Sequence, residues 1–187
     1  MADILKPLTA LGHGAPETVQ IGPLRIAERF DVALASLAQR RGQEAAFAKA
    51  AAGLGLPLPG AARAEAGPVL AAFWVAPEMW FVEAPFASHE DIVAALKPAF
   101  GEAASLTEQT DAWVRFDLSA PDLGPLLERL TNIDWPQAPV GYASRTVIEH
   151  LGVYLIRRGA GEATLYGPRS SAASLLHALE VTAASVV

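Results

Sequence analysis

Apolar and polar residues alternate most regularly over residues 111–118. The apolar set is Ala112, Val114, Phe116 and Leu118, and the residues between them are Asp111, Trp113, Arg115 and Asp117. A period of two places the two sets on opposite faces of an extended chain, which predicts a strand with one buried face. Further strands are expected at residues 19–30 (with a turn at Gly22-Pro23), 69–75, 79–83, 145–157 (bent near Gly152) and 162–166.

Apolar residues at helical spacing predict helices between these strands. The helices are expected at residues 43–54, at 88–101 with Ser88 as the cap and Gly101 as the stop, at 119–130, and from Ser170 or Ser171 onward. The last helix is expected to bury Ala172, Leu175, Leu176 and Leu179. Residues 31–39 fit a strand or a helix equally well, so their structure stays open.

The order of these elements repeats weakly along the chain. Each half runs strand, helix, proline-bearing connector, two strands and helix, with the connectors at residues 56–59 and 133–136. This order predicts an α+β fold of two duplicated ferredoxin-like βαββαβ halves, with helices packed on antiparallel sheets. We expect an extended N-terminal arm at residues 1–18, then a single domain at 19–187 whose pseudo-repeats span about 19–109 and 110–187.

Composition adds an expectation about surfaces. Of the 187 residues, 52% are hydrophobic and only 18% are charged, which is below the usual quarter. Either this chain exposes apolar surface to a partner, or alanine inflates the hydrophobic fraction without consequence.

Charge and residue usage exclude several classes of function. The net charge is −6 and there is no long basic run, so we expect no nucleic-acid partner. Cysteine is absent, which excludes disulfides, thiolate metal sites and cysteine nucleophiles. Residues 1–17 lack a charged-then-apolar signal pattern, and no apolar run is long enough to span a bilayer. These features predict a soluble, cytoplasmic protein with no membrane contact.

A search for catalytic chemistry finds no convincing constellation. The four histidines are scattered, and none has a second histidine at metal-ligand spacing. Glu149 and His150 would point to opposite faces of the strand expected there. Gly53 and Gly55 follow a predicted helix rather than a strand, so they do not form a dinucleotide fingerprint. We therefore expect no catalytic, cofactor-binding or metal-binding residue in this chain.

Two clusters are candidates for contact or structure. Trp74 and Trp80 flank a proline in residues 73–80, and they form either an aromatic contact patch or part of the core. Arg169, Ser170 and Ser171 open the last helix. They suit an anion or a partner's carboxylate, or else an ordinary helix cap beside an exposed arginine.

Six segments carry a resemblance that spans nearly the whole chain, at residues 28–38, 56–60, 73–80, 111–116, 144–150 and 169–175. In their order and spacing they resemble the gamma subunit of heterotetrameric sarcosine oxidase. The resemblance adds one more candidate, Arg145, in the segment that reads Ser-Arg-Thr-Val-Ile-Glu-His. We group it with the two tryptophans, Arg169 and the two serines as interface or structural residues.

The resemblance implies an activity for the complex and none for this chain. The complex oxidises sarcosine to glycine with release of hydrogen peroxide, and tetrahydrofolate accepts the one-carbon unit. The partners would be alpha, beta and delta subunits, with FAD, FMN and NAD held by alpha and beta and zinc by delta. The gamma fold would be similar to the N-terminal domain of the glycine-cleavage aminomethyltransferase.

Three roles are compatible with the sequence. The first is a non-catalytic gamma subunit that supports assembly of the oxidase. The second is a folate-binding module, which the aminomethyltransferase-like fold would allow. The third is a scaffold, in a related N-methyl amino acid oxidase or with another partner.

Overall fold

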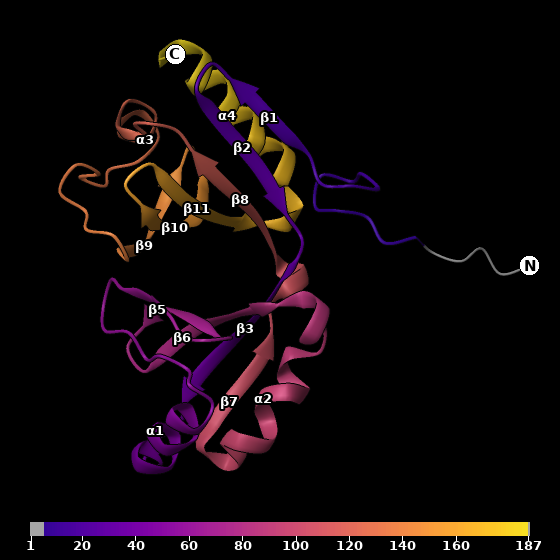
Figure 1. The fold of residues 1–187 in the computed structure, drawn as a ribbon, viewed down its shortest axis with the longest axis vertical. Helices are drawn as coiled ribbons and strands as arrows, with labels where there is room; N and C mark the ends of the chain where they lie inside the picture. The colour runs from indigo at the N-terminus through magenta and orange to yellow at the C-terminus, as the bar shows by residue number, and fades with distance from the viewer. Residues whose placement is uncertain (1–5, 187) are drawn as a thin grey trace, which may run out of the picture.

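The computed structural model describes residues 6–186, which form two antiparallel sheets packed face to face between two layers of helices (Figure 1). One sheet has six strands, in the spatial order β1 (Thr18–Ile21), β2 (Leu24–Arg29), β8 (Trp113–Ser119), β11 (Glu162–Pro168), β10 (Leu151–Gly159) and β9 (Ala143–Ile148). The other has five, in the order β4 (Ala64–Ala66), β5 (Ala71–Ala76), β6 (Met79–Pro85), β3 (Val32–Gln39) and β7 (Ala104–Glu108).

Helices cover the outer face of each sheet. The six-stranded sheet carries α3 (Gly124–Leu130) and α4 (Ala172–Val186), and the five-stranded sheet carries α1 (Glu44–Gly53) and α2 (Ile92–Phe100). Short 3₁₀ turns lie at η1 (Phe86–Ser88), η2 (Gly101–Ala103), η3 (Thr110–Ala112) and η4 (Arg169–Ser171). None of the described helices is both long and apolar enough to cross a membrane.

The α+β class, with helices on antiparallel sheets, is therefore confirmed, and the two sheets share one strand order. In the five-stranded sheet the order β7-β3-β6-β5 matches β2-β8-β11-β10 in the other. The first unit is continuous over residues 32–108, whereas the second takes β2 from the N-terminal side of the chain in place of a strand after α4. The second unit is thus a permuted copy of the first in topology. The boundary expected near residue 109 stays a prediction.

The alternation at residues 111–118 is confirmed in β8. Val114, Phe116 and Leu118 are buried beneath α3 and α4. Trp113 and Arg115 face the second sheet. The first two residues of the predicted strand, Asp111 and Ala112, belong to η3 instead.

Of residues 31–39, all but the first form the interior strand β3. Ala33, Ala35 and Leu37 pack toward the helices, while Leu34 packs against the other sheet. A strand that is buried on both faces has no polar positions to alternate with, which explains why its pattern was ambiguous.

Several local expectations were wrong. The segment expected as one bent strand at 145–157 is two strands, β9 and β10, joined by a tight turn at Glu149 and His150. Glu149 has a φ of 52°, so these two residues belong to the turn and not to the faces of a strand. Asp91, not Ser88, caps α2, because its side chain accepts a hydrogen bond from the Ala94 N–H at 2.8 Å. The pattern also missed β4 and β7.

The expected face of the last helix is confirmed, with Ala172, Leu175, Leu176 and Leu179 all buried. The expected N-terminal arm falls partly outside the described residues. Residues 6–17 contain no helix or strand and fold back against the point where the chain crosses from one sheet to the other.

Candidate functional site

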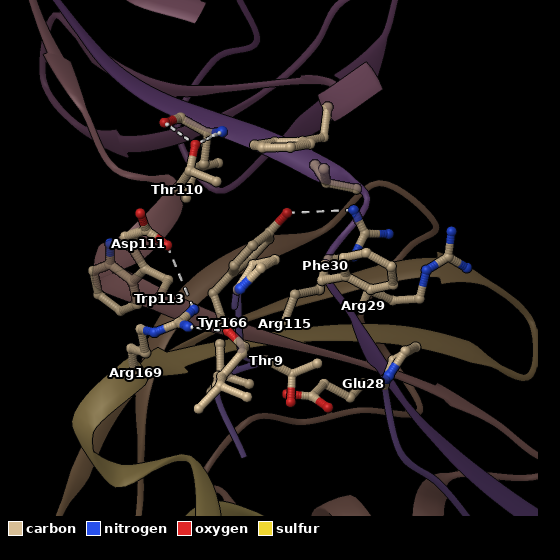
Figure 2. A pocket seen from close by; sticks show the side chains of 18 of the residues that line it. Thr9, Glu28, Arg29, Phe30, Thr110, Asp111, Trp113, Arg115, Tyr166 and Arg169 are labelled. Carbon is tan, nitrogen blue, oxygen red and sulfur yellow. Dashed lines mark hydrogen bonds and ion pairs between the residues drawn. The ribbon is translucent and has the colours of Figure 1, made fainter. Parts of the chain in front are cut away.

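A cavity of about 280 Å³ lies beneath the N-terminal arm, beside the crossover from β2 to β3 (Figure 2). Its walls come from the arm, the crossover, η3, β8 and the start of η4. Most of the lining is apolar or aromatic, including Leu8, Phe30, Phe86 and Trp113. The pocket is concave and largely apolar with few polar groups, which is the usual character of a binding site.

Glu28 holds the arm at one side of the cavity. Its side chain is 4% exposed, and its two carboxylate oxygens accept hydrogen bonds from the Leu11 N–H at 3.0 Å and the Glu17 N–H at 3.1 Å. The Glu28 N–H in turn donates to the Glu17 carbonyl oxygen at 2.8 Å. A buried carboxylate that accepts two main-chain N–H groups is satisfied without a cation and fixes the arm's path.

Arg169 holds the arm at the other side. Its Nη2 donates to the Leu8 carbonyl oxygen at 2.8 Å, across 161 positions of sequence. Its Nη1 lies 3.6 Å from Asp111 Oδ1, beyond hydrogen-bond distance, and the Asp111 side chain is 93% exposed. The arginine therefore ties the arm to the start of the last helix and has only a weak carboxylate partner.

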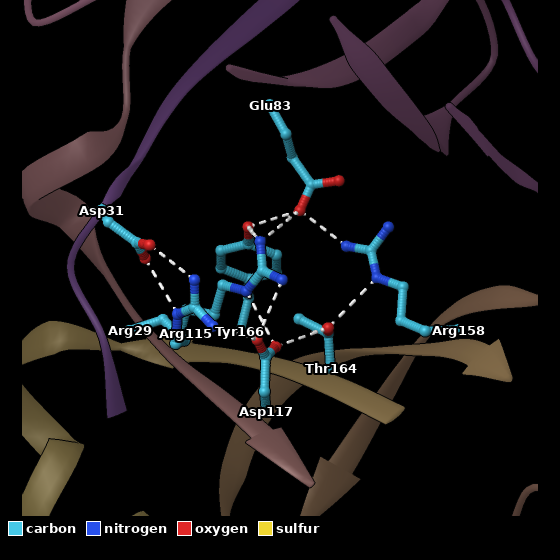
Figure 3. Close-up of polar contacts among 8 residues, drawn as sticks. All are labelled: Arg29, Asp31, Glu83, Arg115, Asp117, Arg158, Thr164 and Tyr166. Carbon is cyan, nitrogen blue, oxygen red and sulfur yellow. Dashed lines mark hydrogen bonds and ion pairs between the residues drawn. The ribbon is translucent and has the colours of Figure 1, made fainter. Parts of the chain in front are cut away.

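A cluster of polar side chains lies between the two sheets (Figure 3). Two of its members, Arg115 and Tyr166, also line the cavity. Glu83 extends from β6 and is almost fully buried. One oxygen, Oε1, accepts from Tyr166 Oη at 2.6 Å, Arg158 Nη2 at 2.6 Å and Arg115 Nη1 at 3.1 Å. All three donors come from the six-stranded sheet, so a single carboxylate joins the two units.

Asp117 organises the rest of this cluster. It accepts from Arg115 Nε at 2.9 Å and Nη2 at 3.1 Å, and from Thr164 Oγ1 at 2.7 Å. Arg158 Nε donates to Thr164 Oγ1 at 3.1 Å. At the edge of the cluster, Arg29 Nε donates to Asp31 at 2.9 Å. We call these eight residues the charged cluster: Arg29, Asp31, Glu83, Arg115, Asp117, Arg158, Thr164 and Tyr166.

The electrostatics of the charged cluster are balanced. Three arginines face three carboxylates, which leaves no surplus charge to attract an ionic ligand. Burial raises the pKa of Tyr166 well above its ordinary value, and the nearby Glu83 carboxylate raises it further. Burial opposes the charge on Arg115, but Tyr166, Glu83 and Asp117 hold the pKa of its guanidinium above the ordinary value. At neutral pH Tyr166 is a hydrogen-bond donor and Arg115 a cation, so neither is poised to take up a proton.

The geometry is that of a cluster that holds the two sheets and the N-terminal arm in place. Among residues 6–186, no group of three or more histidine or carboxylate side chains is arranged to hold a metal ion. No histidine lies in the charged cluster or lines the cavity. What this region can do is join the two sheets, anchor the arm, and accept an apolar group into the cavity.

The structure places the two candidate tryptophans away from the cavity, in the core between the five-stranded sheet and its helices. Trp80 is buried, its Nε1 donates to the Pro59 carbonyl oxygen at 2.8 Å, and its ring stacks on Phe47 with centroids 5.5 Å apart. Trp74 is half-buried and packs against the same core. Trp80 is therefore part of the core, and Trp74 packs at the edge of that core with part of its surface exposed.

The remaining candidates are separated as well. Arg145 is exposed on the edge strand β9, where its guanidinium lies over Gly152. Ser170 and Ser171 lie in η4, and neither side chain caps the turn. Arg169 alone among the predicted residues lines the cavity.

Sequence reasoning did not single out Glu28, Glu83 or Asp117. One signal was present, since Glu83 is a carboxylate within the predicted apolar strand at 79–83, and a buried charge in a strand needs a partner. Arg115 and Asp117 were identified only as the polar face of β8.

Neither a family model nor a curated protein matches this sequence. Solved structures do match it. A chain of heterotetrameric sarcosine oxidase from Corynebacterium sp. U-96, in complex with pyrrole 2-carboxylate, aligns with a TM-score of 0.76 and 20% identity, covering 90% of this chain and 88% of that one. Glycine cleavage system aminomethyltransferase T from Bartonella henselae aligns with a TM-score of 0.62 and 13% identity over 81% of this chain.

The aminomethyltransferase match covers only 44% of that longer chain. At these identities the comparisons establish a shared fold. The resemblance that the sequence suggested, to the sarcosine oxidase and to part of the aminomethyltransferase, is thus confirmed for the fold.

Proposed function

We propose that this chain is a non-catalytic, gamma-type subunit of a heterotetrameric sarcosine oxidase. The observation that carries this proposal is the fold match to a chain of such an oxidase, because it extends over nearly the whole of both chains. A match over the length of a whole subunit favours an equivalent place in an equivalent assembly.

The chain's surface supports a role in assembly. Only 18% of its residues are charged, and several large apolar side chains are more than half exposed. Exposed apolar groups are typical of surfaces that a partner covers. In this proposal the partners are alpha, beta and delta subunits, and the complex is cytoplasmic.

The chemistry would then belong to the partner subunits. The complex would oxidise sarcosine to glycine, release hydrogen peroxide and pass the one-carbon unit to tetrahydrofolate, with FAD, FMN and NAD in alpha and beta and zinc in delta. Gly53 and Gly55 fit this division, because Gly53 ends α1 and Gly55 follows it, so both lack the strand-to-helix setting in which glycines cradle a dinucleotide.

Co-expression with alpha, beta and delta subunits from the same source tests the proposal. We expect a tag on this chain to recover all four subunits in equal amounts, with flavin colour in the complex and none in the isolated chain. We also expect omission of this chain to lower the yield of complex that releases hydrogen peroxide from sarcosine. Full assembly and full activity without this chain would contradict the proposal.

A folate-binding role is the second candidate, and the cavity is the observation that favours it. Phe30 and Trp113 offer aromatic rings for a flat heterocycle, and Arg169 offers a guanidinium for a carboxylate at the rim. Titration calorimetry of the isolated chain with tetrahydrofolate tests this role. Saturable one-to-one binding at micromolar concentration, about −8 kcal/mol, would favour the folate role, and no saturable heat would favour the structural one.

A further inference from the structure

The mouth of the cavity exposes apolar side chains that nothing in the described chain covers. Leu8 on the arm is 55% exposed and Phe30 on the crossover is 59% exposed, and both line the cavity. These two are among the most exposed large hydrophobic residues of the described chain. Their position at the rim of a concave apolar surface is typical of the centre of an interface.

One cation beside this mouth is available to an outside partner. Arg169 makes its hydrogen bond to the Leu8 carbonyl oxygen through Nη2, which leaves Nη1 with the highly exposed Asp111 carboxylate at 3.6 Å. A carboxylate brought by another molecule can replace Asp111 at little cost, since such an exposed pair contributes little.

The other arginines of the lining are not available in this way. Arg29 is hydrogen-bonded to Asp31, and Arg115 to Asp117 and Glu83. Figure 2 shows Arg169 on one side of the cavity and Phe30 on the other, with the arm's Thr9 between them. The mouth therefore combines an apolar recess with one weakly engaged guanidinium at its edge.

We propose that this mouth is a docking site for a partner subunit of the oxidase, which inserts an apolar side chain and pairs a neighbouring carboxylate with Arg169. This inference rests on the proposed function, since it names the surface through which that function operates. The occupant is a protein segment because Leu8 and Phe30 are exposed on the outside of the recess. A small molecule held within the cavity would leave that rim uncovered, whereas a segment lying across it covers both rim and recess.

The test measures the affinity of the full chain for a complex of alpha, beta and delta subunits. Phe30→Asp and Leu8→Asp each place a charge at the mouth, and we expect each to raise the Kd by about tenfold or more. Val140→Asp is the matched control, because Val140 is also 59% exposed and does not line the cavity. We expect the control to bind as the wild type does, and all the variants to melt at the wild-type temperature.

Asp111→Asn tests the proposed ion pair separately. If a partner carboxylate takes the place of Asp111, removing the internal competitor tightens binding several-fold, and the gain disappears in the Asp111→Asn, Arg169→Gln double variant. A merely structural role for Arg169 predicts no change in affinity from Asp111→Asn.

The failures are distinguishable. A wild-type chain that does not bind the other subunits overturns the proposed function and this partner with it. A second outcome is that the wild type assembles, but Phe30→Asp and Leu8→Asp weaken binding no more than Val140→Asp does. That outcome overturns the docking site alone. If Phe30→Asp instead abolishes saturable tetrahydrofolate binding while assembly is intact, the cavity is a small-molecule site and the docking proposal is wrong.

Discussion

The interface between the two sheets has two regions that hold the units together by different physical means. One is an aromatic cluster of Phe73, Phe81, Trp113 and Tyr154, with ring centroids 5.4–5.7 Å apart. The other is the charged cluster around Glu83. Tyr166 belongs to both, because its ring stacks on Phe73 at 5.6 Å and its hydroxyl donates to Glu83.

The difference shows which region supplies the attraction between the two sheets and which one fixes their relative position. Apolar packing is non-directional, so the aromatic cluster can adjust to a small shift of one sheet over the other. Three donors that converge on one carboxylate oxygen cannot shift without leaving buried polar groups unpaired. We infer that the charged cluster fixes how the two units align.

Glu83→Ala should give the largest effect. It leaves Arg115 and Arg158 without their shared carboxylate in a buried site, which costs about 3–5 kcal/mol of unfolding free energy. For a chain of this size that corresponds to a fall in Tm of roughly 6–20 °C. Glu65→Ala, on an exposed position of β4, is the control and should stay within about 0.5 kcal/mol of the wild type. Equal melting of the two variants would show that the charged cluster does not stabilise the fold.

Tyr166→Phe should come next, since it keeps the ring and removes one hydrogen bond to a carboxylate, at about 1.5–3 kcal/mol. Burial raises the pKa of Tyr166 in the folded chain, whereas in the unfolded chain it titrates near 10. As pH rises, the Tyr166 hydroxyl therefore loses its proton in the unfolded wild type but keeps it in the folded wild type. The wild type then loses stability, whereas the phenylalanine variant has no such proton to lose and retains its stability. Urea unfolding near pH 8 and about pH 10.5 should show the difference between them shrinking. A constant difference would mean that Tyr166 is not protected from ionisation.

Phe73→Leu should cost about 1–2 kcal/mol, because leucine fills most of the space and only the ring contacts are lost. In contrast to the tyrosine variant, this cost should be the same at neutral and alkaline pH. A pH-dependent cost would indicate that the aromatic and charged clusters are coupled through Tyr166, and the double variant Phe73→Leu, Tyr166→Phe would measure that coupling.

Asp31→Asn should have the smallest effect. The hydrogen bond from Arg29 lowers the pKa of the Asp31 carboxyl, although partial burial opposes this. Its stabilisation is present above the ordinary pKa of about 4 and is lost as pH falls through the lower folded-state value. The pair is solvent-exposed, so the variant should lose only about 0.2–1 kcal/mol at neutral pH. Unfolding measured near pH 7 and about pH 2.5 should show the difference vanishing in acid.

Local sequence patterns predicted the half-buried helices and strands. They failed for a strand that is buried on both faces and for a turn without the residues usual in turns. The alternation in β8 and the apolar face of α4 were both identified, because each has one face in the core and one in solvent or polar surroundings. The turn between β9 and β10 was missed because Glu149 adopts a positive φ where glycine or asparagine is usual.

The cavity was less predictable than the fold. Arg169 was a candidate because it opens a helix, yet its strongest contact is a main-chain carbonyl of Leu8, which has no signature in the sequence. The Glu28 carboxylate likewise accepts hydrogen bonds from main-chain N–H groups, which have no signature in the sequence either. Contacts of this kind depend on the path of the arm, which residue patterns do not specify.

The permuted strand order has a consequence for synthesis. On the ribosome, β1 and β2 emerge before the other strands, but β8, which pairs with β2, is made only after the whole unit at residues 32–108. That unit has all of its strands early and can close on itself, while the β1–β2 hairpin keeps an open edge until the chain has grown past residue 119. The unit that β2 belongs to is therefore completed last, although β2 itself is translated before the other unit. Protease digestion of ribosome-bound chains stalled before and after β8 would reveal this order as protection of residues 32–108 ahead of residues 18–29.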